Sequence, residues 1–141
     1  MSALYSTKVT ATGGRSGGIA SDDGLLELDL AVPAALGGKG GATNPEQLFA
    51  AGYAACFGNA VIHVTRTTHK IADDDVTVVG TVSMAPNADG GFALSVALDV
   101  AIAGVDQDTA ETIVAQAHKV CPYSNAVRGN IDVELSVRAE A

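Results

Sequence analysis

The clearest signal along the chain is the alternation of apolar and polar positions. Four stretches place apolar side chains at every second position, and a weaker one precedes them. They are residues 26–32, 76–84, 92–102 and 131–137, with residues 4–12 as the weaker stretch. A period of two is typical of strands with one buried face. Residues 87–91 read Asn-Ala-Asp-Gly-Gly, which predicts a hairpin turn between the second and third stretches.

A helical period replaces this alternation in the middle of the chain. Asn44 is a favourable N-cap residue, and Pro45 suits the first helical position, so we expect a helix that begins here and runs to about residue 69. Almost nothing charged occurs between Glu46 and Arg66. A helix that is apolar on nearly all sides is expected to be central and buried.

A second helix is predicted to begin near Asp106 or Asp108, to carry an apolar stripe as far as Cys121, and to end at Pro122. The element order is then β-β-α-β-β-α-β. This order predicts an α+β fold in which helices pack on antiparallel sheet, with residues 1–141 forming a single domain. Two glycine-rich segments, residues 13–18 and 36–41, lack the pattern of a phosphate-binding loop, and we interpret them as mobile surface loops.

Composition and charge narrow the classes of function. The 141 residues carry a formal net charge of −8, which argues against partners such as nucleic acid or an anionic membrane surface. Charged residues, Gly or Pro interrupt every apolar run before about 18 residues, so no membrane span is expected. The first residues show no secretory signal, which favours a reducing cytoplasm. Aromatic residues make up only 4% of the chain, so a monomer core would be thin and self-association is expected.

The chain has two cysteines, Cys56 in the first predicted helix and Cys121 at the end of the second. A buried cysteine often acts as a small hydrophobic residue, and that interpretation stays open for both. The alternative is a redox pair, because both lie on predicted buried faces and each has only the other as a thiol partner.

A reactive thiolate in an apolar helix needs a nearby cation, because burial raises the pKa of a thiol. Arg15 is the best candidate, since it stands between two Gly pairs on a predicted mobile loop. Glu46, at the entry of the first helix, is the natural carboxylate to hold the guanidinium. The alternatives are a solvated loop charge for Arg15 and a favourable first-turn acid for Glu46.

Three aromatic side chains stand near Cys56 at helical spacing: Phe49, Tyr53 and Phe57. They are candidates for the wall of an apolar substrate pocket, although such a stripe is more often plain core. The histidines His63, His69 and His118 show no metal-binding spacing with the cysteines, so no metal site is expected.

Two longer motifs resemble those of a known family. Residues 43–57 (TNPEQLFAAGYAACF) and 120–130 (VCPYSNAVRGN) are similar to the two cysteine motifs of organic hydroperoxide resistance (Ohr) proteins, within the OsmC/Ohr superfamily. The Gly-Gly-Arg segment that ends at Arg15 matches as well, and the resemblance extends from about Tyr5 to Val137.

The resemblance implies a cysteine-based peroxidase built as an intertwined homodimer with active sites at the subunit interface. It assigns Cys56 as the peroxidatic residue, Cys121 as the resolving residue, and Arg15 and Glu46 as the residues that activate the thiolate. It further implies organic and fatty-acid hydroperoxides as substrates. No bound cofactor is implied; the reductant is an external dithiol, dihydrolipoamide on a lipoylated partner protein.

Two alternatives stay open at this stage. One is an OsmC-type sister peroxidase with the same thiols and different substrates. The other is a non-catalytic dimer that senses redox state or binds a hydrophobic ligand.

Overall fold

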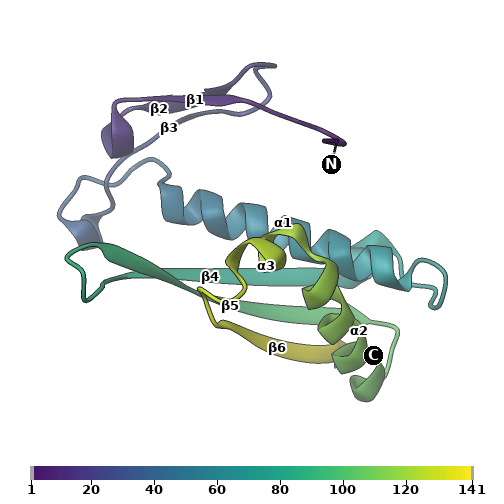
Figure 1. The fold of residues 1–141 in the computed structure, drawn as a ribbon. Coiled ribbons are helices and arrows are strands. Elements are labelled where there is room, and N and C mark those ends of the chain that lie inside the picture. The colour runs from purple at the N-terminus through teal and green to yellow at the C-terminus, as the bar shows by residue number, and fades with distance from the viewer. Residues whose placement is uncertain (1, 141) are drawn as a thin grey trace. The chain divides into compact units, whose positions relative to one another are not determined.

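The computed structural model describes residues 2–140, which divide into two compact units, residues up to Leu48 and residues from Phe49 onward (Figure 1). The expectation of one domain over residues 1–141 stays a prediction. The α+β class is confirmed, since both sheets and helices are present.

The first unit contains an antiparallel sheet with strand order β1-β2-β3, formed by β1 (Val9–Thr12), β2 (Gly18–Ser21) and β3 (Glu27–Asp29). Strand β2 is not predicted by the residue pattern, because its first residue, Gly18, belongs to the glycine-rich segment expected to be a loop. In the structure this segment is a tight connection that contains the 3-10 turn η1 (Gly14–Ser16). A Cβ at Gly17 would lie 1.7 Å from the carbonyl oxygen of Thr12, so this close approach requires glycine.

The rest of the first unit leads into the long helix. Residues after β3 include a second 3-10 turn, η2 (Ala34–Leu36), and a bridge between Leu30 and Thr43. Helix α1 (Pro45–Thr65) begins as expected, because the Asn44 side chain accepts a hydrogen bond from the Gln47 backbone N–H at 2.9 Å.

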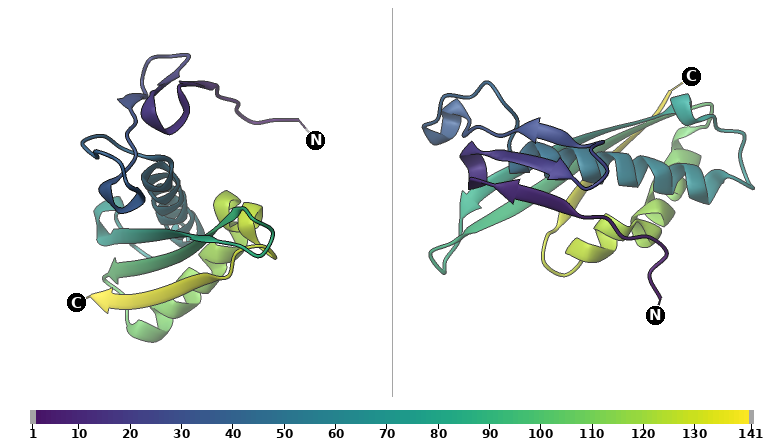
Figure 2. Two further views of the ribbon diagram at one scale, coloured as in Figure 1. Left: turned by 90° about the vertical axis from the view of Figure 1, so that its left-hand side faces the viewer. Right: turned by 90° about the horizontal axis from the view of Figure 1, so that it is seen from above.

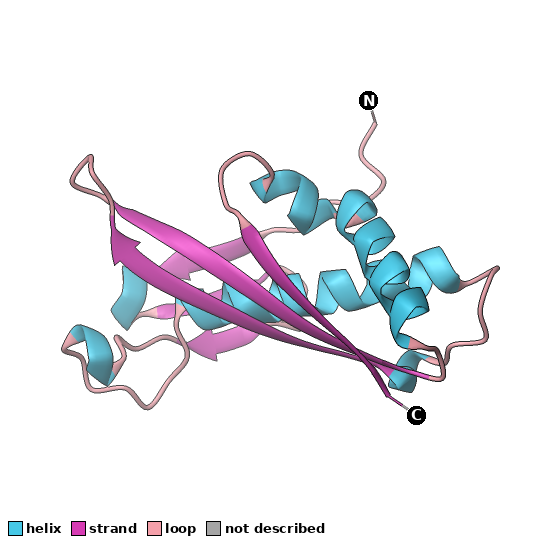
Figure 3. Cartoon of the chain, turned by 90° about the horizontal axis from the view of Figure 1, so that it is seen from below, coloured by secondary structure: helices cyan, strands magenta, loops and turns pink. Residues whose placement is uncertain are grey.

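In the second unit, strands β4 (Val76–Pro86), β5 (Phe92–Ala103) and β6 (Val133–Glu140) form a twisted sheet in the order β4-β5-β6 (Figure 3). The predicted hairpin is confirmed: β4 pairs antiparallel with β5, and the Asn87 N–H donates to Gly91 O at 2.9 Å. The expectation of purely antiparallel sheet is wrong for β6, which runs parallel to β5. Parallel neighbours need a crossover, and the helices between β5 and β6 provide it (Figure 2).

That crossover consists of two helices, α2 (Gln107–Val120) and α3 (Pro122–Val127). The N-cap of α2 is Asp106, as expected, and its carboxylate accepts from the Thr109 N–H at 2.8 Å. Helix α3 was not predicted, because Pro122 was interpreted as a stop. Pro122 instead occupies the first position of the new helix, where the missing N–H costs nothing.

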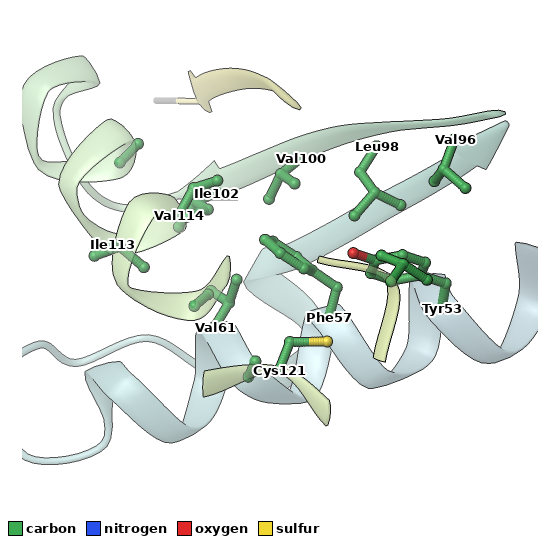
Figure 4. Packing of buried hydrophobic residues seen from close by; sticks show 14 residues of the cluster. Tyr53, Phe57, Val61, Val96, Leu98, Val100, Ile102, Ile113, Val114 and Cys121 are labelled. Carbon is green, nitrogen blue, oxygen red and sulfur yellow. The ribbon is translucent and has the colours of Figure 1, made fainter. Parts of the chain in front are cut away.

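The core of the second unit lies between the sheet and its helices (Figure 4). Strand β5 supplies alternate side chains, and α1 and α2 supply one face each. The largest fully buried side chains in the core include Tyr53, Phe57 and Val61 of α1, Leu98 and Ile102 of β5, and Val114 of α2. The first helix therefore buries one face in this core. The prediction of a helix buried on nearly all sides is wrong for the single chain, since only five of its 21 residues are buried.

Helix α1 ends at Thr65, four residues before its predicted end near residue 69. By length and composition it is the one described helix that could cross a membrane, contrary to the expectation that interruptions exclude any such run. Tyr53, Phe57 and Val61, however, pack in the protein's own core, as the residues of a core helix do.

Candidate active site

The two cysteines, 65 positions apart in the chain, meet in the second unit. Cys56 lies on α1, whereas Cys121 lies at the junction of α2 and α3, where it is the C-cap of one and the N-cap of the other. Their sulfur atoms are 3.7 Å apart, and both thiols are free. A disulfide needs a separation of about 2.05 Å, so a small movement of either side chain would close the bond.

The surroundings keep Cys56 protonated. Burial raises the pKa of its thiol, and the neighbouring Cys121 raises it further, whereas a backbone hydrogen bond from Tyr123 acts in the opposite direction. Cys56 is half-buried and Cys121 is fully buried. A nucleophilic thiolate at Cys56 therefore requires a positive charge that these neighbours do not supply.

Arg15 and Glu46 form a bidentate ion pair in the first unit. Arg15 Nη1 donates to Glu46 Oε1 at 2.6 Å, and Arg15 Nη2 donates to Oε2 at 2.9 Å. The pair raises the pKa of Arg15 and lowers that of Glu46, so both groups are charged at neutral pH. This fork geometry fixes the plane of the guanidinium, and the Arg15 side chain as a whole is 38% exposed.

The three aromatic candidates occupy different environments. Tyr53 and Phe57 are fully buried members of the core, while Phe49 is only partly buried. Tyr123 was not among these candidates, yet its ring packs against Phe49 at 6.3 Å and against Tyr53 at 5.6 Å between centroids. Tyr123 is 38% exposed, so it and Phe49 form an aromatic surface that a ligand can reach.

Gly52 allows this arrangement. A Cβ at Gly52 would lie 2.5 Å from the Tyr123 hydroxyl oxygen, too close for the ring to keep its place on α1. In the sequence, Tyr123 stands two residues after Cys121, within the motif of residues 120–130.

Two polar residues beside the cysteines were also missed. The Ser124 hydroxyl lies 2.6 Å from the Tyr53 hydroxyl and 2.8 Å from His118 Nδ1. Neither side chain stood out in the sequence, because Ser124 follows the proline at which the helix was expected to end and His118 has no metal-binding spacing. Among residues 2–140, no group of three or more His, Cys, Asp or Glu side chains could hold a metal ion.

The sequence and fold of the chain are similar to those of known proteins over nearly its whole length. Residues 38–136 match the family described as OsmC-like protein. The chain is 48% identical over 137 residues to the organic hydroperoxide resistance protein OhrB of Bacillus subtilis, covering 96% of this chain and 99% of that protein.

Solved structures agree with this relation. The organic hydroperoxide resistance protein OsmC of Legionella pneumophila superposes with a TM-score of 0.93 at 55% identity, covering 97% of this chain and 99% of that one. An organic hydroperoxide resistance protein of Vibrio cholerae, with captopril bound in one of its active sites, superposes with a TM-score of 0.92 at 54% identity, covering 97% and 94%. This chain therefore belongs to the OsmC-like family, among the organic hydroperoxide resistance proteins.

Proposed function

We propose that this protein defends the cell against oxidative stress by reducing organic hydroperoxides to alcohols, with Cys56 as the attacking thiol and Cys121 as the resolving thiol. The observation that carries the proposal is the 3.7 Å contact between the two sulfur atoms. The names of its relatives supply the class of substrate.

The reaction has three balanced steps. The Cys56 thiolate attacks one peroxide oxygen, the O–O bond breaks, and the alkoxide leaves and takes a proton, so that Cys56 becomes a sulfenic acid. The Cys121 thiol then attacks the Cys56 sulfur, which releases water and forms the disulfide. An external dithiol reduces that disulfide by exchange and is itself oxidised to a disulfide.

Arg15 is proposed to supply the charge that ionises Cys56. The pKa of Cys56 is raised by burial, and a guanidinium next to the sulfur would lower it again. Glu46 would hold that guanidinium in one orientation through its two short hydrogen bonds.

Alkylation of Cys56 by iodoacetamide, measured against pH, tests the role of Arg15. We expect Arg15→Ala to move the midpoint of the rate to higher pH, and Arg15→Lys to move it less. The exposed Arg138→Ala is the matched control. Identical profiles for wild type and Arg15→Ala would exclude Arg15 as the activating cation.

The proposed substrates carry an apolar group, and the exposed edges of Phe49 and Tyr123 would receive it. Burial of apolar area stabilises a complex by about 25 cal/mol per Å², so an alkyl or aryl group favours binding where hydrogen peroxide has nothing to bury. We expect cumene hydroperoxide to react faster than hydrogen peroxide, and Phe49→Ala to narrow this difference. An unchanged preference would remove Phe49 from the binding surface.

A homodimer is proposed from the uncovered face of α1. Most of this apolar helix is not buried by its own chain. A shallow groove of about 500 Å³ follows it, lined by small and apolar side chains of α1 and β4, such as Ala54, Ala55, Ile62 and Val78. The Vibrio cholerae relative has more than one active site, which supports an assembly of several chains. Light scattering after size exclusion tests this: a monomer would contradict it, and Ile62→Glu should dissociate a dimer.

The decisive experiment is turnover of cumene hydroperoxide with different reductants. We expect dihydrolipoamide, free or on a lipoylated protein, to sustain turnover better than glutathione or thioredoxin. Cys56→Ser should abolish it, and Cys121→Ser should leave Cys56 prone to further oxidation. If one equivalent of peroxide oxidises the thiols but no dithiol restores them, the protein is a redox sensor instead of a peroxidase.

A further inference from the structure

One buried hydroxyl joins three helices next to the cysteines. Ser124 lies on α3, Tyr53 on α1 and His118 on α2, and the Ser124 Oγ is within hydrogen-bond distance of both partners. Ser124 and Tyr53 are fully buried, and His118 is half-buried. The cysteine chemistry proposed above does not use any of the three side chains.

Both hydrogen bonds can form together. Burial and the positive charge of Arg128 lower the pKa of His118, so its ring is neutral at physiological pH. In the tautomer with the ring proton on Nε2, Ser124 donates to Nδ1 and accepts from Tyr53; in the other tautomer, Nδ1 donates to Ser124, which donates to Tyr53. Each of these buried groups is satisfied, so losing the Ser124 hydroxyl would leave polar atoms of Tyr53 and His118 without this partner.

The backbone next to Ser124 depends on these two hydrogen bonds for its position. Helix α3 has only six residues, and Cys121 at its N-cap makes no side-chain capping hydrogen bond. A helix this short needs tertiary contacts to be stable. The segment from Cys121 to Ser124 nevertheless places two groups at Cys56: the Cys121 sulfur at 3.7 Å and the hydrogen-bonding backbone of Tyr123.

We propose that Ser124 is a positioning residue of the dithiol site, whose hydroxyl clamps the start of α3 to α1 and α2 and thereby keeps Cys121 within bonding reach of Cys56. The side chain of Ser124 touches neither sulfur nor substrate in this role. It acts through the backbone between itself and Cys121, and it raises the effective concentration of the Cys121 thiol at Cys56.

This inference rests on the proposed function for its biological meaning, because the clamp would speed the attack of Cys121 on the oxidised Cys56. Without the clamp, the Cys56 sulfenic acid would persist, and a second peroxide molecule would oxidise the sulfenic acid to sulfinic acid. The clamp itself is a property of the dithiol pair, and it can be measured without any peroxide.

The first measurement is therefore the equilibrium between dithiol and disulfide in a buffer of reduced and oxidised lipoamide. We expect Ser124→Ala to lower the equilibrium constant for forming the Cys56–Cys121 disulfide by about tenfold or more. Ser136→Ala, an exposed serine on β6, is the matched control and should equal wild type. If the equilibrium constant of Ser124→Ala equals those of wild type and Ser136→Ala, the proposal is overturned.

The second measurement follows one equivalent of cumene hydroperoxide by acid quench and mass spectrometry. We expect Ser124→Ala to convert its sulfenic acid to the disulfide at least tenfold more slowly than wild type, and to accumulate Cys56 sulfinic acid. Equal rates of disulfide formation would contradict the clamp. If wild type does not react with peroxide at all, the proposed function fails, while the lipoamide equilibrium still decides the role of Ser124.

A gentler variant covers the case in which Ser124→Ala does not fold. Tyr53→Phe keeps the buried ring and removes only the hydroxyl that bonds to Ser124. We expect Tyr53→Phe to lower the equilibrium constant for disulfide formation, as Ser124→Ala does. Where both variants fold, the double variant should have the same equilibrium constant for disulfide formation as Ser124→Ala alone. Both changes remove the same hydrogen bond between residues 53 and 124. Fully additive effects, or a wild-type equilibrium in Tyr53→Phe, would overturn the proposal.

Discussion

Replacing Gly52 by alanine tests how Tyr123 is held on helix α1. The added Cβ would lie 2.5 Å from the Tyr123 hydroxyl oxygen and 3.0 Å from its ring carbon Cζ. Atoms cannot remain that close, so the ring must move. Because Tyr123 is 38% exposed, it can swing outward into solvent and the backbone of α1 can stay in place.

Two opposing effects set the magnitude. Alanine in a helix interior is favoured over glycine by about 1 kcal/mol. The displaced ring loses its contacts with Phe49 and Tyr53, each worth about 0.5–1.5 kcal/mol, or about 1–3 kcal/mol together. The loss equals or exceeds the gain, so we expect Gly52→Ala to lower the free energy of unfolding by up to about 2 kcal/mol.

Gly58, one and a half turns later in the same helix, provides a matched control. A Cβ there would lie 3.7 Å from Val78 Cγ2, an ordinary contact, so Gly58→Ala should stabilise the protein by about 1 kcal/mol. Both variants are compared by urea unfolding at one protein concentration, followed by far-UV circular dichroism. The chain has no Trp, so tyrosine fluorescence reports the movement of the ring.

The same change in a Tyr123→Ala background completes the test. With the ring absent, Gly52→Ala should stabilise as Gly58→Ala does, which gives a coupling of about 1–3 kcal/mol between residues 52 and 123. If Gly52→Ala stabilises wild type by the full helix gain and shows no coupling to residue 123, then the ring does not pack on α1 as described.

Three further outcomes are expected. Phe57→Ala should lower the free energy of unfolding by about 3–5 kcal/mol, because this fully buried ring leaves a cavity, measured by urea unfolding. Asp106→Ala should lower the melting temperature at pH 7, since it removes the cap on the Thr109 N–H. The folded state lowers the pKa of Asp106, so this stabilisation is present above the ordinary Asp value of about 3.9 and is lost as pH falls through the folded value. Gly17→Ala should speed amide exchange in β1 and β2, because its Cβ collides with the Thr12 backbone.

Each of these outcomes has a control or a contrary result. Phe92→Ala, at a side chain that is 68% exposed, should change stability by no more than about 0.5 kcal/mol. Asp106→Asn should restore most of the cap, and a melting difference between wild type and Asp106→Ala that is the same in acid as at pH 7 would contradict the pH argument. Unchanged exchange in Gly17→Ala would mean that the β1–β2 connection is looser than described.

Much of the fold was predictable because local patterns carried it. The alternation over residues 76–84 and 92–102 corresponds to β4 and β5, and the caps at Asn44 and Asp106 begin α1 and α2. The elements that were not predicted are those without a local periodic pattern of apolar residues. Strand β2 has only four residues and begins at Gly18 of a glycine-rich segment, and α3 is too short to show a pattern and begins with a proline.

The direction of β6 could not be predicted from its own residues. Parallel and antiparallel strands show the same alternation, and only the crossover through α2 and α3 decides which neighbour β6 pairs with and in which sense. The extent to which α1 is buried was likewise undecided, because apolar residues on all sides show that a helix needs cover but not what provides it.

Some residues of the candidate site were predictable from the sequence, and others were not. Residue type and position together singled out Cys56, Cys121, Arg15 and Glu46: the chain has only two cysteines, Arg15 stands between two Gly pairs, and Glu46 lies at the entry of the first helix. Ser124 gave no such signal, since its importance lies entirely in its neighbours.

By itself, the sequence determined which chemical groups are available and where the two long helices and the β4–β5 hairpin begin, because capping, turn formation and periodicity act over a few neighbouring residues. Only the tertiary structure decided that two thiols 65 positions apart touch, and that one serine hydroxyl joins three helices beside them. Such contacts depend on how helices pack over a sheet. That packing is a property of the whole chain, and no short segment encodes it.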